Sequence, residues 1–339
     1  MRLLRFASLL GFAAAVSVAM VGGAAASPPG PHASRVVGHV YVNDNTAPVN
    51  TVAGYDRHAD GSLTPISGSP FAVGGAGAGH ADASQGSLQL SADGRYLLAV
   101  DAGSNQVSVL RVAHDGTLQI ANGSPVASNG VNPVSIGVHH DLVYVANAGP
   151  GTNVGDTNYT GFRLDGHGQL TPIPNSTYVL PNDSQPGQVL FNRDGKKAAG
   201  TRVGSSQIDS FRVGDDGRLT PAFGSPFAAQ AFSPPQGFGQ FGSEFSPVHP
   251  DQLFVSDAHT AAGGGAPGLV SSFIDSPNGT LTPVGAPVAN PGAGSCWIEI
   301  THNGQFLFVV NTGSGTVSSY SIGHGGTLAG VSLATLKRR

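Results

Sequence analysis

The stretch SADGRYLLAVDAGSNQVSVLRVAHDGTLQIANGSP, residues 91–125, decides the fold of this chain. It contains three apolar or alternating runs, which are separated by a polar turn and by an Asp-Gly turn: 96–100, 107–112 and 117–120. Short runs of this kind, bounded by Gly, Asp and Asn, are typical of β-strands joined by tight turns. The stretch therefore predicts a small antiparallel sheet that closes on a Gly-Ser-Pro sequence.

The unit recurs along the chain. A Gly-containing turn followed by a leucine occurs six times, at intervals of about 50 residues: Leu63, Leu118, Leu170, Leu219, Leu281 and Leu328. A period in this range is a signature of repeat architectures. Gly (50) and Pro (24) are abundant, but they lie at these turns and so indicate many short strands rather than disorder.

A second marker lies upstream in each repeat. It is an apolar strand that ends in a polar residue: Asp44, Asp101, Asn147, Asp257 and Asn311, with Arg202 as the exception. We expect the Asp and Asn side chains to bond the backbone of the turn ahead of them, as Asx turns do. A further strand precedes most of these, which gives four short strands per repeat.

Six four-stranded sheets cannot bury both faces alone, but radial packing of the repeats buries them and protects the strand edges. The sequence therefore predicts an all-β chain folded as a β-propeller with six repeats. Repeat one starts at its second strand, and we expect the last unit to lack its inner strand. Either Val36-Val37 or residues 331–336 fill the missing position, or the chain lacks part of a ring.

The N-terminal residues belong outside this fold. Arg2 and Arg5 precede an apolar run, and Ala24-Ala25-Ala26 offers a cleavage site, so residues 1–26 are expected to be a signal peptide. Residues 27–35 form a Pro-rich leader expected to be disordered, and 36–339 form the propeller domain. No second apolar run approaches the ~20 residues of a membrane span. We therefore expect a secreted, periplasmic or extracellular protein without a membrane span.

Charge and motifs exclude several functions. Lys and Arg total 16 against 20 Asp and Glu, so there is no basic stripe for nucleic acid. The single cysteine excludes an intrachain disulfide framework. The chain has no phosphate-binding loop, no Cys/His zinc spacing and no nucleophile elbow. We expect no cofactor and no metal, and a monomer.

The repeats resemble the lactonase-type propeller family, which includes 6-phosphogluconolactonase-like proteins and carboxymuconate cycloisomerases, and they are similar to YVTN-type repeats. The likeness is carried by SADGRYLL (91–98), VSVLRV (107–112), DGRLT with GSP (216–226) and GQFLFVVN (304–311). It covers residues 36–328. The family usually has seven blades.

The resemblance also implies a site. Family members that act on lactones carry a His, an Arg and a Glu at the entrance of the central channel. Gln185 and Gly187 stand where the His would be, no Arg precedes Trp297, and Glu244 matches the family Glu. One residue of the three is therefore carried over.

Glu244 also stands out on its own. We align it with the apolar inner-strand residues Leu88, Val134, Val189 and Ile298. A carboxylate at such a position is costly unless it faces water or finds a partner, and its pKa should rise. A bulge near Pro247 would change the face of the strand on which Glu244 lies. The alternative to a functional role is a structural role for Glu244.

Other residues are candidates for ligand contacts. Arg202 replaces the usual Asp or Asn and could clamp a carboxylate, or lie on the surface of a degenerate repeat. His80 and Asp82 lie in a long loop that should approach the channel. Phe238 lies in a long aromatic loop beside it, and Gln185 stands at the family His position. Together they suggest a site for a small-molecule or carbohydrate ligand.

The sequence therefore predicts an exported lactonase-like propeller. If it is an enzyme, the reaction expected is lactone hydrolysis or cycloisomerisation of a small anionic or sugar-derived ligand at the channel mouth, with Glu244 as base and Arg202 holding a carboxylate. The alternative is a non-catalytic secreted propeller that binds a protein or a carbohydrate.

Overall fold

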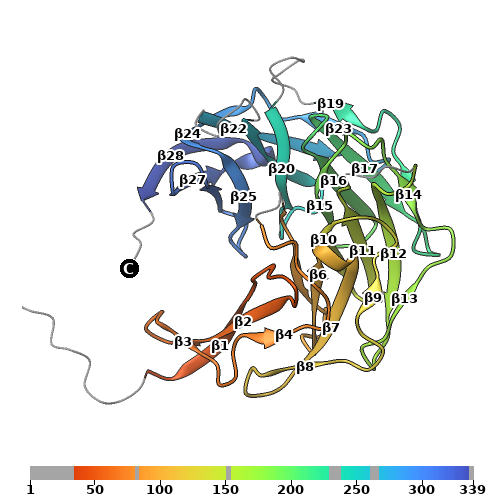
Figure 1. Cartoon of the computed structure of the whole chain (residues 1–339). Coiled ribbons are helices and arrows are strands. Elements are labelled where there is room, and N and C mark those ends of the chain that lie inside the picture. The colour runs from red at the N-terminus through yellow and green to blue at the C-terminus, as the bar shows by residue number, and fades with distance from the viewer. Residues whose placement is uncertain (1–33, 81–83, 150–153, 229–237, 260–266, 336–339) are drawn as a thin grey trace, which may run out of the picture. The chain divides into compact units, whose positions relative to one another are not determined.

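The computed structural model describes residues 34–80, 84–149, 154–228, 238–259 and 267–335. The residues from Val36 onward form one compact unit. It consists of six antiparallel sheets that follow one another along the chain and pack as the blades of a β-propeller (Figure 1). The predicted fold is confirmed.

Each blade is built outward from the channel. The innermost strands of blades 2 to 6 are β5 (Leu88–Leu90), β10 (Pro133–His139), β15 (Pro186–Phe191), β20 (Phe238–Phe245) and β25 (Ser295–Ile300). The second strands, counted from blade 1, are β1 (Val36–Asn43), β6 (Tyr96–Asp101), β11 (Leu142–Asn147), β16 (Lys197–Arg202), β21 (Gln252–His259) and β26 (Phe306–Asn311).

The outer half of each blade follows the same order. The third strands are β2 (Thr51–His58), β7 (Gln106–Val112), β12 (Asn158–Leu164), β17 (Gln207–Val213), β22 (Pro267–Asp275) and β27 (Thr316–Ile322). The fourth strands are β3 (Leu63–Pro65), β8 (Leu118–Ile120), β13 (Leu170–Pro172), β18 (Leu219–Pro221), β23 (Leu281–Pro283) and β28 (Leu328–Thr335).

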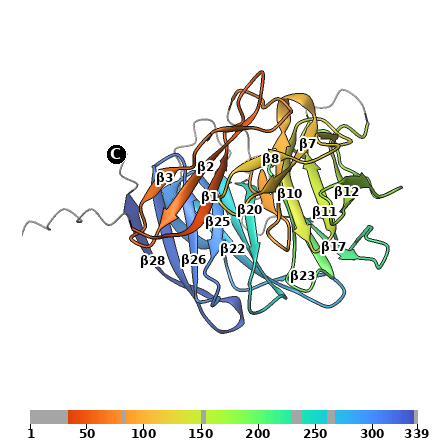
Figure 2. The same ribbon diagram turned by 90° about the horizontal axis from the view of Figure 1, so that it is seen from below.

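In blades 1 to 5 a short extra strand pairs with the third strand: β4 (Phe71–Ala72), β9 (Val126–Ala127), β14 (Tyr178–Val179), β19 (Phe227–Ala228) and β24 (Val288–Ala293). Two 3-10 turns complete the described structure: η1 (Ala102–Ser104) and η2 (His324–Gly326). Figure 2 shows the blades from below.

The turn glycines serve close packing as well as reversal of the chain. Gly116 has a φ of 79°, in the left-handed region where glycine is favoured. A Cβ atom there would lie 2.5 Å from Nδ1 of His39 in blade 1. The Gly116 carbonyl also accepts the Tyr41 hydroxyl at 2.6 Å. This repeat turn therefore has to be a glycine, because it touches the preceding blade.

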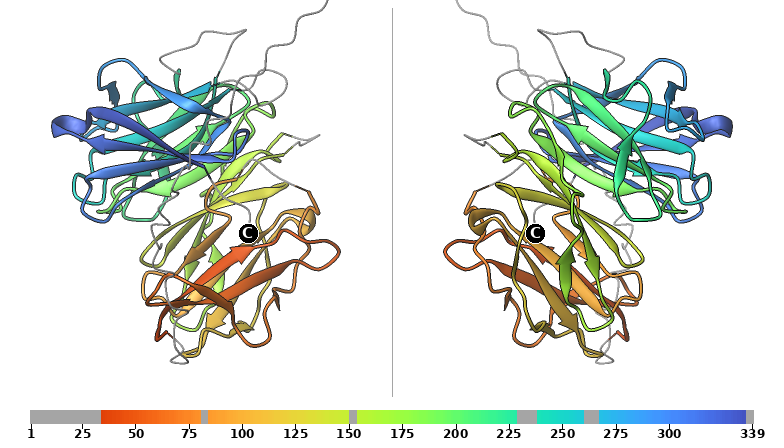
Figure 3. Two further views of the ribbon diagram at one scale, coloured as in Figure 1. Left: turned by 90° about the vertical axis from the view of Figure 1, so that its left-hand side faces the viewer. Right: turned by 90° about the vertical axis from the view of Figure 1, so that its right-hand side faces the viewer.

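Apolar side chains are buried between successive blades. Five clusters each join one blade to the next, from blade 1 through blade 6. Among the described residues, no such cluster joins blade 6 back to blade 1. The outward faces of these two blades instead expose Val42, Phe306 and Phe308 by 38–49%. The two blades border the opening visible in Figure 1, and Figure 3 shows the same opening from the side.

The two ends of the chain explain this opening. Blade 1 begins at its second strand, as predicted, because β1 pairs with β2 and the outer strands follow. Val36-Val37 start β1, and Val331 to Thr335 belong to β28, the outer strand of blade 6. Neither fills the vacant innermost position. The expectation that the last unit lacks its inner strand is wrong, since β25 supplies it.

Candidate functional site

The inner strands give the channel two ends: an entry end, where these strands begin, and an exit end, where they finish. Glu244 is the second-last residue of β20 and so lies toward the exit end. It lines a hollow of about 410 Å³ together with Arg193 and His302. A carboxyl, a guanidinium and an imidazole therefore meet at one cavity.

A second carboxyl comes from the next blade. Glu244 pairs with Phe254 across β20 and β21, and Glu299 pairs with Phe308 across β25 and β26. Both partners precede the polar strand end by three residues, so the two glutamates occupy the same position in neighbouring blades. The predicted alignment of Glu244 with Ile298 is wrong by one residue, because the turn after β20 is longer: seven residues separate the paired Phe245 and Leu253, whereas six separate Ile300 and Leu307.

The two carboxyls influence each other. Burial and, to a smaller extent, the nearby Glu299 raise the pKa of Glu244 to about 8. Burial also raises the pKa of Glu299, while His302 works against that rise. At neutral pH Glu244 is therefore mostly protonated, and Glu299 is the member of the pair that more readily carries the charge.

Arg193 is fixed at the wall of this cavity. Its Nη1 donates to the carbonyl of Pro247 at 2.7 Å, in the turn that follows β20. A guanidinium held in this way can bind an oxyanion or a carboxylate. The cavity thus combines a proton donor and a cation, and Glu299, close enough to act on Glu244, is a candidate base beside it. These are groups that acid–base chemistry on a carbonyl compound needs. Sequence reasoning found Glu244 but missed Arg193, Glu299 and His302.

Arg202 lies at the other end of the ring. It pairs with Pro186, the first residue of β15, and so belongs to the entry end. Its guanidinium donates two hydrogen bonds to the Asp209 carboxylate, Nε to Oδ2 at 2.7 Å and Nη2 to Oδ1 at 2.6 Å. Both side chains are buried, and Tyr159 also donates to Asp209 at 3.1 Å. The structure therefore does not bring Arg202 together with Glu244.

The Arg202–Asp209 pair is one member of a set. In blades 2, 5 and 6 the Asp or Asn that marks the second strand accepts from, or donates to, a serine on the third strand: Asp101 with Ser108, Asp257 with Ser271, and Asn311 with Ser318. The side chains thus point into the blade and not to the turn ahead. The predicted Asx turns are wrong at these positions, because burial makes a cross-strand partner the better one.

The remaining predicted ligand contacts fall near the entry end. His80 lies in the loop before β5 and accepts the Asn45 side-chain amide through its carbonyl at 2.8 Å. Gln185 precedes β15 with a φ of 43°, and its carbonyl accepts the amide of Val203. Phe238 starts β20. Asp82 lies outside the described residues.

A short segment, Ser84 to Ser87, crosses the channel between the two ends. The Gln85 amide donates to the carbonyl of Gly187, and its side chain bonds both the carbonyl (2.9 Å) and the amide (3.0 Å) of Ile298. Gly86 accepts the amide of Ile136 at 2.8 Å. We call residues 84–87 the clasp, because they tie together inner strands of blades 3, 4 and 6.

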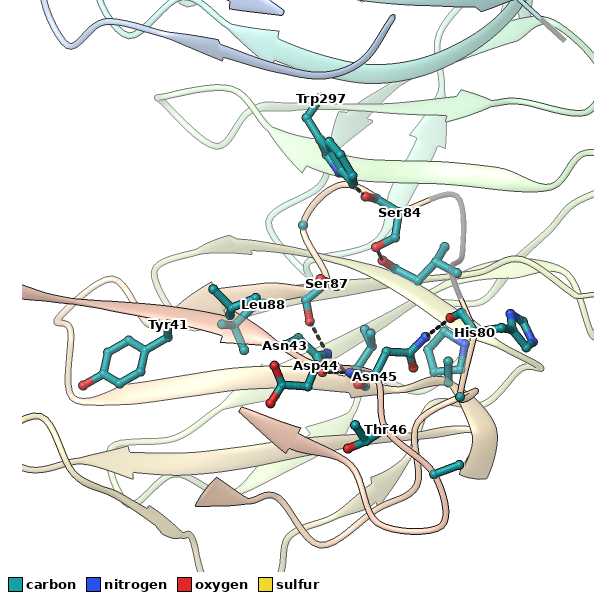
Figure 4. Close-up of a pocket in the computed structure, with 18 residues that line it drawn as sticks. Tyr41, Asn43, Asp44, Asn45, Thr46, His80, Ser84, Ser87, Leu88 and Trp297 are labelled. Carbon is teal, nitrogen blue, oxygen red and sulfur yellow. Dashed lines mark hydrogen bonds between the residues drawn. The ribbon is translucent and has the colours of Figure 1, made fainter. Parts of the chain in front are cut away.

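A larger hollow, of about 770 Å³, lies beside the clasp. Figure 4 shows it between β1, the His80 loop and Trp297. Many of its polar side chains are engaged within the protein: Asn43 bonds the Val100 carbonyl, and the Trp297 indole N–H donates to the Ser84 carbonyl. We call this hollow the blade 1 pocket.

Two absences concern the described part of the chain only. No group of three or more His, Cys, Asp or Glu side chains there is arranged to hold a metal ion. In the same residues, no helix has the length and apolar character to cross a lipid bilayer.

The fold has relatives among solved structures. A protein from Lactobacillus plantarum matches with a TM-score of 0.70 and 15% identity, over 89% of this chain and 83% of that one. The periplasmic gluconolactonase of Pseudomonas aeruginosa matches with a TM-score of 0.68 and 18% identity, over 88% and 82%. A streptogramin B lyase matches with a TM-score of 0.55 and 16% identity, over 90% and 82%.

Sequence comparison adds no assignment, since neither a family model nor a curated protein matches the chain. At these identities the structural matches establish the fold alone, and the lyase shows that it hosts more than one reaction. The chain has the fold of the lactonase-type β-propellers.

Proposed function

We propose that this protein is an exported lactone hydrolase that opens a small sugar-derived lactone in the exit-end cavity. The observation that carries the proposal is Glu244, a carboxyl whose pKa is raised to about 8 at the wall of a cavity that also holds Arg193 and His302. Perturbed carboxyls in cavities are typical of acid–base catalysts. The match to a periplasmic gluconolactonase supports the substrate class.

The proposed reaction uses the glutamates in opposite protonation states. Glu299 accepts a proton from water as the water oxygen attacks the lactone carbonyl carbon. Arg193 stabilises the oxyanion that forms. The ring C–O bond then breaks, and protonated Glu244 donates its proton to the departing ring oxygen. The product hydroxy acid releases its own proton to solvent, and a proton returns from Glu299 to Glu244 through water.

Export belongs to the same proposal. The charged start, the apolar run and Ala24-Ala25-Ala26 support a signal peptide of residues 1–26. N-terminal sequencing of the mature protein from a native-like secretion host should give Ser27 as the first residue. An uncleaved protein retained in the cytoplasm would contradict this part of the proposal without touching the reaction.

The reaction is tested with Glu244→Gln, which keeps the shape of the side chain and removes its titratable proton. Loss of a general acid should lower kcat for glucono-lactone by about 10²–10⁴-fold. The matched control is Asp257→Asn on the same blade, a carboxyl with a pKa of about 7 that is buried away from this cavity. It should leave kcat within about twofold of wild type.

The pH profile gives a second readout of the same group. The protonated form of Glu244 is the donor, so kcat should fall as the pH rises through about 8, after spontaneous hydrolysis is subtracted. Equal rates for wild type and Glu244→Gln would sink the catalytic proposal. The protein would then be a non-catalytic secreted propeller, the alternative that the blade 1 pocket favours.

A further inference from the structure

Strand β1 has a vacant side. The order β1-β2-β3, with β4 on β2, repeats the order β11-β12-β13, with β14 on β12, so β1 stands in the second-strand position of its blade. In the other five blades the second strand lies between an innermost strand and a third strand. β1 pairs with β2 alone. Blade 1 therefore lacks the strand that would line the channel.

The ladder shows which groups are left over. The Asp44 amide donates to the Thr51 carbonyl at 2.9 Å, which fixes the alternation of bonded pairs along β1 and β2. It follows that the amides and carbonyls of His39, Tyr41 and Asn43 point to the side away from β2. Among the described residues, no hydrogen bond reaches this row of backbone groups. An unpaired edge of this kind is a template for another strand.

The vacant side opens into the blade 1 pocket. Leu88 and Val134 supply an apolar wall, Trp297 is 41% exposed beside them, and Asp44 is exposed at the end of β1 (Figure 4). These side chains would face a strand placed along β1. They fit an uncharged or basic peptide with apolar residues at alternate positions.

The sequence that precedes β1 is poorly suited to that place. In blade 3 the innermost strand immediately precedes the second strand, as β10 precedes β11. The residues in the corresponding place before β1 include Pro28, Pro29 and Pro31. Pro28 and Pro29 are consecutive, and one of two consecutive residues must turn its amide toward the paired strand, where proline has none to donate. We therefore take the occupant to come from another molecule.

We propose that the free edge of β1 binds an extended peptide from a partner protein, which completes blade 1 as its innermost strand. The equivalent strand β10 defines the expected register. There Ser135, Gly137 and His139 pair with residues of β11 whose amides and carbonyls point inward. Ile136 instead donates to the clasp at Gly86. A bound peptide should alternate in the same way.

The test uses the full chain and a synthetic peptide that copies residues 132–139, NPVSIGVH. Trp297 is the single tryptophan of the chain and lines the pocket, so its emission reports binding directly. A saturable change is expected. N-methylation at the Gly137 position, whose amide would face β1, should weaken binding about tenfold or more. The matched control, N-methylation at the Ile136 position, should weaken it much less.

Hydrogen exchange locates the site independently of fluorescence. On binding, the amides of His39, Tyr41 and Asn43 should gain protection, while those of Val40 and Val42 should change little, because they already face β2. No saturable binding, or equal binding of the two methylated peptides, would overturn the proposal. The proposal would also fail if glucono-lactone or another polyol changed the Trp297 emission and the peptide did not. None of these outcomes depends on Glu244 or on the proposed reaction.

Discussion

Blade 5 carries three carboxyls with raised pKa values, Glu244, Asp257 and Asp275, and the first two differ in their surroundings. Burial raises the pKa of Asp257 to about 7, and its oxygens accept hydrogen bonds from Ser271 and Gln240. The pKa of Glu244 rises to about 8 with no hydrogen bond to its carboxyl among the described residues. Asp257 closes a polar network inside the blade, whereas Glu244 borders a cavity. A raised pKa therefore indicates chemistry only where the group can reach a ligand.

The same distinction separates the two ends of the channel. At the entry end, the buried Asp101 and Asp257 side chains bond serines on the neighbouring strand, and Arg202 with Asp209 is the charged version of this pairing. At the exit end, the glutamates repel each other and face water. The entry-end groups should thus control stability, and the exit-end groups should control activity.

Removal of Arg202 should produce the largest loss of stability. Arg202→Ala leaves the Asp209 carboxylate buried without its cation, which should lower the free energy of unfolding by about 3–5 kcal/mol. Denaturant titration measures the loss. The activity of the remaining folded fraction should stay near that of wild type, because Arg202 is remote from the exit-end cavity.

The control restores the pairing of the neighbouring blades. Arg202→Asp combined with Asp209→Ser recreates the arrangement of Asp257 and Ser271, so this double variant should recover most of the lost stability. If Arg202→Ala proved as stable as wild type but lost activity, Arg202 would belong to the reaction and the separation of the two ends would fail.

The pH dependence of stability should distinguish Glu244 from Asp257. Each has a folded-state pKa above its ordinary value, so the native state holds the proton more tightly than the unfolded state does. Stability should therefore fall as the pH rises, for Glu244 between about 4.5 and about 8 and for Asp257 between about 3.8 and about 7. Glu244→Gln should remove the slope between pH 7 and 8.

Asp257→Asn serves as the comparison, since it should flatten the curve only below about pH 7. Unfolding in urea at a series of pH values measures both slopes. A wild-type slope between pH 7 and 8 that persists in Glu244→Gln would show that another group titrates there.

The repeats made the blades predictable from sequence. Turn glycines, alternating strands and polar strand ends recur at a fixed period, so local chemistry alone indicates the propeller. The direction in which the Asp101 and Asp257 side chains point was not predictable. A short carboxylate can bond either the backbone of the turn ahead or a side chain on the neighbouring strand. Only the packing of the third strand against the second decides between them.

The site was predictable in part, for a related reason. Glu244 stands out in the sequence as a charged residue in an apolar strand, and the structure places it at a cavity. Glu299 carries the same signal, but the turn after β20 is one residue longer than the turn after β25, and this difference hides the equivalence of the two glutamates. Arg193 and His302 lie in turns, where polar residues are ordinary. They become candidates only when the fold brings three blades to one cavity.

The clasp offers the last and smallest test, because it ties inner strands of three blades together. Gln85→Ala removes the side-chain bonds to Ile298 and leaves the amide and carbonyl of that residue without these partners. The expected cost is about 1–3 kcal/mol of unfolding free energy. Gln119→Ala, at an exposed strand position in blade 2, is the matched control and should cost less than about 0.5 kcal/mol.

Hydrogen exchange in the Gln85→Ala variant should rise in β25 more than in β10. The reason is that blade 6 has no apolar cluster with blade 1 among the described residues and therefore depends more on the clasp. A uniform rise over all blades would mean that Gln85 supports the ring as a whole and does not hold blade 6 in particular.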